Sequence, residues 1–170
     1  MSLIVAPDPN WPAQAQAEAD RWRALDLPGL VTIHHIGSTS VSGLPAKPII
    51  DLLPVFETTD ACDAAQTRIE TLGYDWLGAF GLPDRRYVRM DDPETGKRLF
   101  QAHCYAQGSA EITRHLVFRD ALRDNAPLRA AYTSVKSRCA ALHPGDHRAY
   151  GACKANWIDK AETKALEHYT

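Results

Sequence analysis

Residues 34–51 read HHIGSTSVSGLPAKPIID, and they join two segments whose composition is typical of β-strands. The first segment, residues 30–36 (LVTIHHI), is rich in β-branched residues and ends at a turn of glycine and hydroxyl residues, 37–40. The second segment, residues 48–56 (PIIDLLPVF), is almost wholly apolar, which predicts a central strand covered on both faces. Pro54 has no N–H to donate, so we expect incomplete ladder pairing at that point.

The rest of the chain alternates helix and strand signals. Apolar residues at helical spacing predict helices, and β-rich runs bounded by Gly or Pro predict strands. The expected helices cover residues 11–27, 59–72, 113–124, 127–142 and 146–168. The other expected strands cover residues 3–6, 74–77, and an antiparallel pair at 85–90 and 99–106. This order predicts a single α/β (α+β) domain over residues 1–170, with a mixed sheet and a C-terminal helical subdomain.

The composition is that of a folded protein. A chain of 170 residues is long enough for one well-buried core, and 45% hydrophobic with 24% charged residues excludes wholesale disorder. No apolar run approaches the roughly 20 residues that a bilayer-crossing helix needs. Residues 1–12 lack the basic start and apolar stretch of a signal peptide. We therefore expect a cytoplasmic protein without a membrane-spanning segment.

The cysteines indicate a reducing compartment. Cys62, Cys104, Cys139 and Cys153 are scattered along the chain, and no two of them form a CxxC pair. Cysteines in an intracellular protein are usually buried, reduced thiols. The sequence therefore predicts free thiols and no disulfide.

The net charge of −2 hides an asymmetry along the chain. Residues 1–84 carry 4 Lys/Arg against 11 Asp/Glu, a net of −7, whereas residues 85–170 carry 15 against 10, a net of +5. Five of the basic residues fall within residues 85–98. Local basic charge on a near-neutral protein favours a small anionic ligand over a long nucleic acid. The alternative is that the two halves neutralise each other within one domain.

The turn at Gly37, Ser38, Thr39 and Ser40 has the composition of an anion site. Glycine lets backbone N–H groups approach a ligand closely, and hydroxyl groups donate to phosphate oxygens. The alternative is a Ser/Thr-rich turn that satisfies only its own backbone. Neither the P-loop pattern GxxxxGK[ST] nor the nucleophile elbow GxSxG is present here. The turn therefore predicts phosphate binding rather than acyl transfer.

Arginines gather on one of the expected strands. Alternation places Arg89 with Arg85 and Tyr87 on one face and Arg86 on the other, so Arg86 and Arg89 share a site only at a strand end or bulge. An arginine beside His103 of the partner strand can hold a phosphate or carboxylate, and histidine suits proton transfer near neutral pH. The alternative is an exposed hairpin face with ordinary cross-strand pairs.

A row of basic residues follows on the expected helix at 113–124. His115, Arg119 and Arg123 are spaced four apart, so they form one stripe along the helix. The stripe either faces the same anion site or is a solvated helix face, and the sequence leaves both alternatives open.

The run HIGSTSVSGLPAKPIID at residues 35–51 resembles the signature of the GrpB family, members of which also occur fused to dephospho-CoA kinases. More broadly, a Gly-Ser at a strand end followed by an acidic strand is similar to the DNA polymerase β-like nucleotidyltransferases. The resemblance covers nearly the whole chain. Its other motifs are Arg85-Arg86-Tyr87, Gln101-Ala102-His103, RHLVFRDALR at 114–123, and the late Tyr132, Lys136, Tyr150 and Lys154.

The resemblance implies a nucleotidyltransferase-like fold in which Gly37 and Ser38 hold a nucleotide and Asp51 binds a divalent metal. In that superfamily the acidic strand reads Dh[DE]h, and a third acid comes from a later strand. Here the second acidic position is Leu53, and two closely spaced metals need several carboxylates. We therefore expect Asp51 to bind one Mg²⁺ ion weakly. Alternatively, Asp51 only pairs with Lys47 or an arginine.

Two functions follow from these residues and the resemblance. The first is a nucleotidyltransferase-like enzyme that acts on a nucleotide or another phosphorylated small molecule. The second is a non-catalytic binding module of the same fold, which Leu53 favours. The expected catalytic residues are Asp51, which is also the metal ligand, and His103. The residues expected to hold the ligand are Gly37, Ser38, Thr39, Ser40, Lys47, Arg86 and Arg89.

Overall fold

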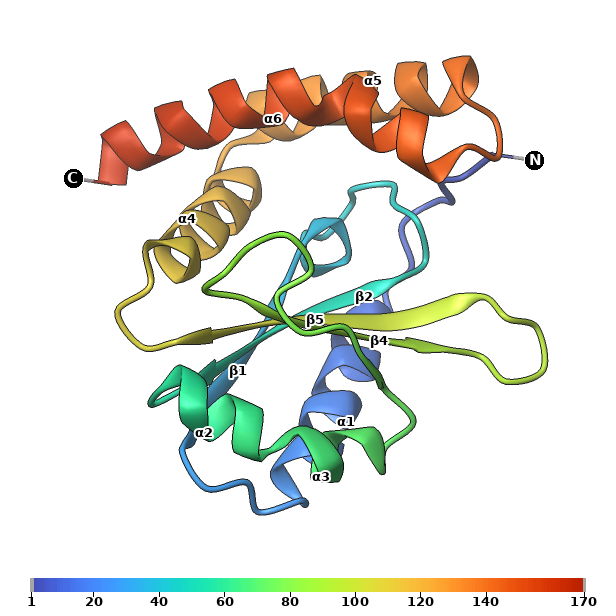
Figure 1. Ribbon diagram of the computed structural model, residues 1–170. Helices are drawn as coiled ribbons and strands as arrows, with labels where there is room; N and C mark the ends of the chain where they lie inside the picture. The colour runs from blue at the N-terminus through green and yellow to red at the C-terminus, as the bar shows by residue number, and fades with distance from the viewer. Residues whose placement is uncertain (1, 170) are drawn as a thin grey trace.

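The computed structural model describes residues 2–169 and has a five-stranded sheet with helices on both faces (Figure 1). The strand order is β1-β2-β5-β4-β3. The strands are β1 (Leu30–Ile36), β2 (Ile50–Phe56), β3 (Asp75–Trp76), β4 (Arg86–Asp91) and β5 (Arg98–Ala106). The helices are α1 (Trp11–Arg23), α2 (Thr59–Ala64), α3 (Gln66–Glu70), α4 (Ala110–Asp124), α5 (Ala126–Leu142) and α6 (His147–Tyr169).

The sheet is mixed, which confirms the predicted fold class. β2 runs antiparallel to β1 and parallel to β5, and β4 is antiparallel to both β5 and β3. Ile36 pairs with Asp51, Asp51 with Gln101, and Gln101 with Arg89. One row of residues therefore crosses β1, β2, β5 and β4 at the end of β1 where the 37–40 turn begins.

β2 is central and buried, as predicted from its apolar composition. It lies between β1 and β5, and all of its residues except Asp51 are buried. Pro54 pairs with Ile33 of β1, whereas the register with β5 includes Leu52 and Val55 but not the residues between them. The missing N–H of proline is consistent with this interruption.

The two faces of the sheet pack against different helices. Even-numbered β2 residues such as Leu52 and Phe56 join the large core that also contains Trp22 of α1. Odd-numbered Leu53 faces the other way and packs in a small cluster with Leu116 of α4. Because side chains alternate along a strand, Asp51 lies on the α4 side of the sheet. Figure 1 shows α4, α5 and α6 on that side and α1, α2 and α3 on the other.

Three local elements differ from the sequence prediction. The predicted strand at 3–6 is reduced to one bridge between Val5 and Ala46. The helix expected at 59–72 is divided at Ala65, where the N–H donates to Cys62 O in a tightened turn. Helix α1 ends at Arg23, and the next turn holds Asp26 at a positive φ of 49°. Each difference lies in a short segment where tertiary contacts outweigh local preference.

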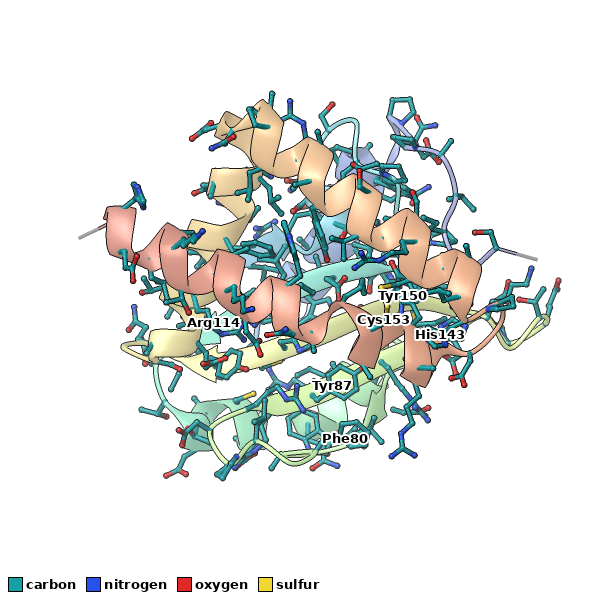
Figure 2. All side chains as sticks on the ribbon, turned by 90° about the horizontal axis from the view of Figure 1, so that it is seen from above. Phe80, Tyr87, Arg114, His143, Tyr150 and Cys153 are labelled. Atoms are coloured by element: carbon teal, nitrogen blue, oxygen red, sulfur yellow. A yellow bond between two sulfur atoms is a disulfide. The ribbon has the colours of Figure 1, made fainter. Side chains whose placement is uncertain are left out.

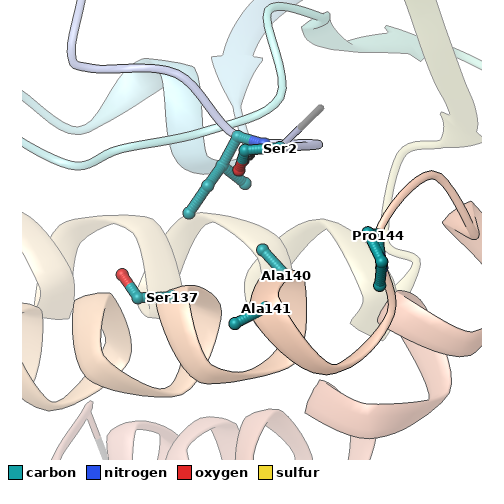
Figure 3. A pocket seen from close by; sticks show the side chains of 6 residues that line it. Ser2, Ser137, Ala140, Ala141 and Pro144 are labelled. Atoms are coloured by element: carbon teal, nitrogen blue, oxygen red, sulfur yellow. Dashed lines mark hydrogen bonds between the residues drawn. The ribbon is translucent and has the colours of Figure 1, made fainter.

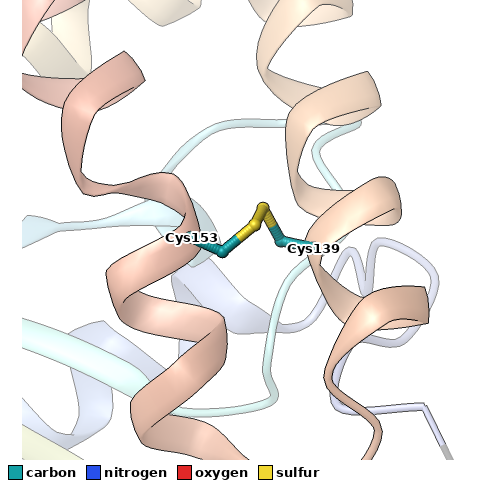
Figure 4. Close-up of a disulfide and its surroundings, with 2 residues drawn as sticks. All are labelled: Cys139 and Cys153. Atoms are coloured by element: carbon teal, nitrogen blue, oxygen red, sulfur yellow. A yellow bond between two sulfur atoms is a disulfide. The ribbon is translucent and has the colours of Figure 1, made fainter.

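The cysteine prediction was wrong for one pair. Cys139 of α5 and Cys153 of α6 form a disulfide, shown in Figure 4. Helices α5 and α6 lie against each other, which brings together two cysteines 14 residues apart. Cys62 and Cys104 are free and buried, as expected. The spacing of the cysteines did not reveal this disulfide, because its formation depends on how α5 and α6 pack against each other.

The helical part carries no membrane-spanning element among the residues described. Within residues 2–169, no helix combines the length and the apolar character that crossing a bilayer requires. α6 has 23 residues but carries charged side chains such as Lys154 and Lys160. The cytoplasmic location stays a prediction.

Candidate functional site

The turn after β1 is built around Gly37. Its backbone has φ 73° and ψ −173°, and a 3₁₀ turn over Ser38–Ser40 follows. A Cβ atom at Gly37 would lie 2.6 Å from Oδ2 of Asp51. Glycine is therefore needed both for a backbone conformation that other residues rarely adopt and for close contact with a carboxylate. The turn lies directly against Asp51.

The hydroxyl groups of the turn have different partners. Ser40 Oγ donates to Gly37 O at 2.5 Å, and Thr39 Oγ1 lies 2.9 Å from His35 Nε2. Ser38 Oγ instead accepts from Lys136 Nζ at 2.6 Å. The Ser40 and Val41 amides donate within the turn, whereas those of Ser38 and Thr39 have no acceptor among residues 2–169. Ser38 and these two amides are the part of the turn left for a ligand.

Asp51 is held by two side chains of β5. Gln101 Nε2 donates to Asp51 Oδ1 at 2.5 Å, and His103 Nε2 lies 3.5 Å from the same oxygen. Burial raises the pKa of the Asp51 carboxyl, but the hydrogen bonds from His103 and Gln101 and the charge of Lys47 outweigh burial and lower it. Asp51 is therefore a carboxylate at neutral pH.

Three lysines, here called the lysine cluster, gather near Asp51: Lys47, Lys136 and Lys154. Lys136 of α5 is only 2% exposed, and none of the three makes an ion pair within 4.0 Å among residues 2–169. Burial, followed by repulsion from Lys154, lowers the pKa of Lys136 to about 7. Burial and repulsion from Lys47 lower the pKa of Lys154 to about 8. Buried ammonium groups without a carboxylate partner are poised to accept an anion.

Two tyrosines line the lysine cluster. Lys47 and Lys154 lie over the Tyr150 ring, with their Nζ atoms 5.6 and 4.1 Å from its centroid. Lys136 Nζ lies 5.0 Å from the centroid of Tyr132. Tyr150, which Figure 2 shows near Cys153 on α6, is 1% exposed, yet its hydroxyl has no hydrogen-bond partner in the part of the chain that the structure describes. A buried hydroxyl without a partner indicates a place for a polar ligand atom.

The basic stripe on α4 packs against the sheet and the turn. Arg119 Nη1 donates to His35 O at 3.1 Å, and Arg123 Nε donates to Ser40 O at 3.0 Å. The His115 ring lies 5.7 Å from that of His103. Burial and the nearby Arg114 lower the pKa of His115 to about 3, so it is neutral. His115 and Arg119 are therefore partly buried, whereas Arg123 is exposed. Arg119 holds the end of β1, and Arg123 holds the turn.

The predicted arginines are not brought to the turn. Arg86 faces the opposite side of the sheet, where Nε and Nη2 bind Asp63 of α2 at 2.5 and 2.9 Å. Arg89 lies in register with Gln101 but forms its ion pair with Asp75, at 3.9 Å. Alternation along β4 separates the two, as the sequence indicated, and no bulge reunites them. Lys47, in contrast, does lie near Asp51.

The residues around Asp51 do not fit a two-metal centre. Leu53, at the second acidic position, is fully buried among apolar side chains. The residue in register with Asp51 on β5 is the amide Gln101. Within residues 2–169, no three His, Cys, Asp or Glu side chains gather to hold a metal ion. A lone carboxylate can hold one Mg²⁺ only together with ligand phosphates, so weak binding of a single Mg²⁺ at Asp51 stays a prediction.

A separate pocket of about 370 Å³ lies between the N-terminal segment and the end of α5 (Figure 3). It is lined by Ser2, Ile4, Ser137, Ala140, Ala141 and Pro144. None of these side chains is charged or titrates near neutral pH. The side chains that could act on a ligand are therefore those around Asp51 and in the lysine cluster rather than those of this pocket.

The arrangement of sheet and helices is that of the nucleotidyltransferases. A structure of Cid1 in complex with its short product ApU superposes with a TM-score of 0.57 and 14% identity, covering 88% of this chain and 48% of that one. At this identity the likeness shows the fold alone. It confirms the nucleotidyltransferase-like architecture expected from the sequence.

The particular family follows from closer matches. The GrpB protein family model matches residues 3–164, so the chain belongs to the GrpB family. The crystal structure of the conserved protein GrpB from Enterococcus faecalis superposes with a TM-score of 0.90 and 37% identity, covering 98% of both chains.

Curated relatives extend beyond this chain. UPF0157 protein YqkA of Bacillus subtilis is 35% identical over 95% of this chain, which spans 46% of YqkA. A dephospho-CoA kinase of Mycolicibacterium paratuberculosis is 29% identical over 96% of this chain, which spans 46% of that protein. The chain thus spans about half the length of these two relatives, and the expected link to dephospho-CoA kinases is confirmed.

Lys136, Lys154 and Tyr150 belong to the motifs of the family resemblance, but no role was predicted for them. A signal for them is present in the sequence. Tyr132 precedes Lys136, and Tyr150 precedes Lys154, by four residues each. At this spacing on a helix, each lysine lies over the ring of its tyrosine.

Proposed function

We propose that this chain binds a nucleotide or another phosphorylated small molecule, with phosphate between the lysine cluster and Ser38. The observation that carries this proposal is Lys136: an almost fully buried ammonium group whose one hydrogen-bond partner among residues 2–169 is a hydroxyl. An ammonium group has three donors, and a phosphate would satisfy the remaining two. The free amides of Ser38 and Thr39 lie in the same turn and would add donors.

The burial of the lysines also limits the size of the ligand. A long nucleic acid is held mainly by exposed basic side chains along its backbone. Lys136 is a buried residue of α5, so its ammonium group suits a small anion. Structures of the fold relative Cid1 include one bound to MgGTP, which supports a nucleotide as the ligand class. At most one divalent ion would accompany the ligand at Asp51.

The Lys136→Met variant tests the proposal. Methionine keeps the length and packing of the side chain but removes its charge, so we expect affinity for tripolyphosphate or ATP to fall roughly 30-fold, or about 2 kcal/mol. Removing a buried charge is not expected to lower the unfolding temperature at pH 7. Isothermal titration calorimetry with tripolyphosphate or ATP, carried out once in EDTA and once in Mg²⁺, measures the affinity.

Lys160→Met is the matched control, because Lys160 is exposed on α6. It should bind like the wild type. Equal affinity of the Lys136→Met variant and the wild type would exclude the lysine cluster as the phosphate site.

Anion binding is expected to weaken as the pH rises above about 7. The pKa values of Lys136 and Lys154 in the free protein are about 7 and 8, so a phosphate that needs both charged must take up protons. The loss is then up to about tenfold in affinity per pH unit for each proton taken up. Titrations of tripolyphosphate at pH 8 in buffers of different ionisation enthalpy give the proton count, and a count of zero would contradict the prediction.

The free energy of unfolding of the unliganded protein should rise with pH, whereas the affinity for anions falls. The folded pKa of Lys136 lies at about 7, below the ordinary value of 10.5, so unfolding takes up a proton between these two pH values. The destabilising effect of this lysine is complete below pH 7 and disappears as the pH rises toward 10.5. Comparison with Lys136→Met isolates this contribution.

Transfer of the nucleotidyl or phosphoryl group is the second candidate function, and the Asp51–His103 pair supports it. A carboxylate 3.5 Å from an imidazole orients the ring, and the ring can take a proton from a ligand hydroxyl. Leu53 at the second acidic position, with no group of three His, Cys, Asp or Glu side chains to hold a metal among the residues described, favours binding without transfer. Release of phosphate or pyrophosphate from ATP in the titration samples, with water as the acceptor of the transferred group, decides between the two: binding without release supports the module, and release supports the enzyme.

A further inference from the structure

The loop between β3 and β4, residues 77–85, carries an exposed aromatic ring. In Figure 1 this loop rises above the sheet on the side of α4, α5 and α6. Phe80 at its tip is 60% exposed. Its φ is 46°, a conformation that a bulky residue rarely adopts, and Gly78 and Gly81 beside it also have positive φ. Such strain is stored mainly at functional positions.

The Phe80 ring is held in place by the start of β4. It stacks on the Tyr87 ring, with centroids 5.3 Å apart and planes 22° apart (Figure 2). Arg85 Nη2 donates to Phe80 O at 2.7 Å, and the guanidinium lies 5.1 Å from the Tyr87 ring centroid. Phe80 is thus an ordered, stacked ring with much of its surface uncovered, rather than a loose side chain.

The stacked pair is connected to Asp51 by hydrogen bonds. The Tyr87 hydroxyl donates to Gln101 Oε1 at 2.8 Å, and Gln101 Nε2 donates to Asp51 Oδ1 at 2.5 Å. The Tyr87 and His103 rings lie 5.2 Å apart. β4 is two strands from β2, a distance of roughly 10 Å across the sheet. A small ligand bound at Asp51 can extend over this distance.

We propose that Phe80 and Tyr87 form a stacking platform for the base of a nucleotide whose phosphates occupy the lysine cluster. The inference rests on the proposed function and narrows its ligand class from phosphorylated small molecules to nucleotides. An exposed aromatic ring can stack on any of the nucleic-acid bases, because every base has a π-face. Arg85 Nε is buried and has no hydrogen-bond partner among the described residues 2–169, and an acceptor on the base or ribose would satisfy it.

The test compares ligands with and without a base. Wild-type protein is titrated with ATP, UTP and tripolyphosphate, and the titrations are repeated with Phe80→Ala and Lys136→Met. We expect Phe80→Ala to lower the affinity for both nucleotides about 5- to 150-fold, which corresponds to a stacking energy of about 1–3 kcal/mol. The affinity for tripolyphosphate should stay unchanged. Lys136→Met should lower the affinity for all three ligands. Leu82→Ala, at an exposed apolar residue of the same loop, is the matched control and should bind like the wild type.

Each outcome has a distinct meaning. If tripolyphosphate binds through Lys136 but the nucleotides bind no more tightly, or Phe80→Ala leaves them unchanged, the platform is wrong and the proposed function stands. If Phe80→Ala weakens tripolyphosphate as much as ATP, the loop only shapes the phosphate site, and the platform is again wrong. If none of the ligands binds the wild type, the proposed function fails and the platform with it.

Discussion

Replacing Gly37 with alanine is expected to lower the free energy of unfolding by about 3–4 kcal/mol. An alanine there adopts a φ, ψ combination that costs about 1–3 kcal/mol, and its Cβ lies 2.6 Å from Asp51 Oδ2. Relieving that overlap must displace a carboxylate that Gln101 and His103 hold, at a further cost similar to overpacking a core. Urea unfolding followed by tryptophan fluorescence measures the loss.

Gly43→Ala separates the two causes. Gly43 also has a positive φ, of 77°, but a Cβ there meets nothing within 4 Å. We expect this variant to lose only the backbone contribution, about 1 kcal/mol. If Gly37→Ala is no less stable than Gly43→Ala, the contact between the turn and Asp51 is not the constraint inferred from the structure.

Reducing the disulfide between Cys139 and Cys153 is expected to cost about 3 kcal/mol. The bond closes a loop with a sequence separation of 14 residues, and in the chain-entropy account a loop of this size stabilises the folded state by about that amount. Guanidinium unfolding with and without dithiothreitol should show the lower midpoint in the reduced sample.

The double variant Cys139→Ser/Cys153→Ser serves as the control, because its stability should not respond to dithiothreitol. Thiol titration of the unfolded, unreduced protein should count the two free cysteines, Cys62 and Cys104. Four thiols and coincident unfolding curves would show that the helices are held by packing alone.

The order of secondary structure was predictable because most elements carry a strong local signal. The β-branched run of β1 and the apolar run of β2 are strands in the structure, and both flank the predicted turn. The failures are short: the strand at 3–6 is one bridge, and the break at Ala65 interrupts a helix whose composition is continuous. At such places tertiary contacts decide between conformations of similar local free energy.

The sheet side of the site was only partly predictable: Asp51 lies against the turn, but Arg86 and Arg89 of β4 do not reach it. In the structure Asp51, Gln101 and His103 lie on one face because side chains alternate strictly along each strand. The lysine side depends on how α5 and α6 dock, and no local pattern encodes that docking. Lys136 lies 98 residues from the Ser38 hydroxyl that it binds. For the same reason the Cys139–Cys153 pairing could not be read from cysteine spacing.

The helical layer contacts the end of β1 and the turn after it through donors from far along the chain, which affects the order of folding events. Arg119, Arg123 and Lys136 reach His35, Ser40 and Ser38 over sequence separations of 84, 83 and 98 residues. Contacts that close such long loops form late, after local helices and hairpins. We therefore expect ligand-binding competence to appear among the last events of folding. A chain that ends at residue 125 would carry Asp51 without Lys136 or Lys154.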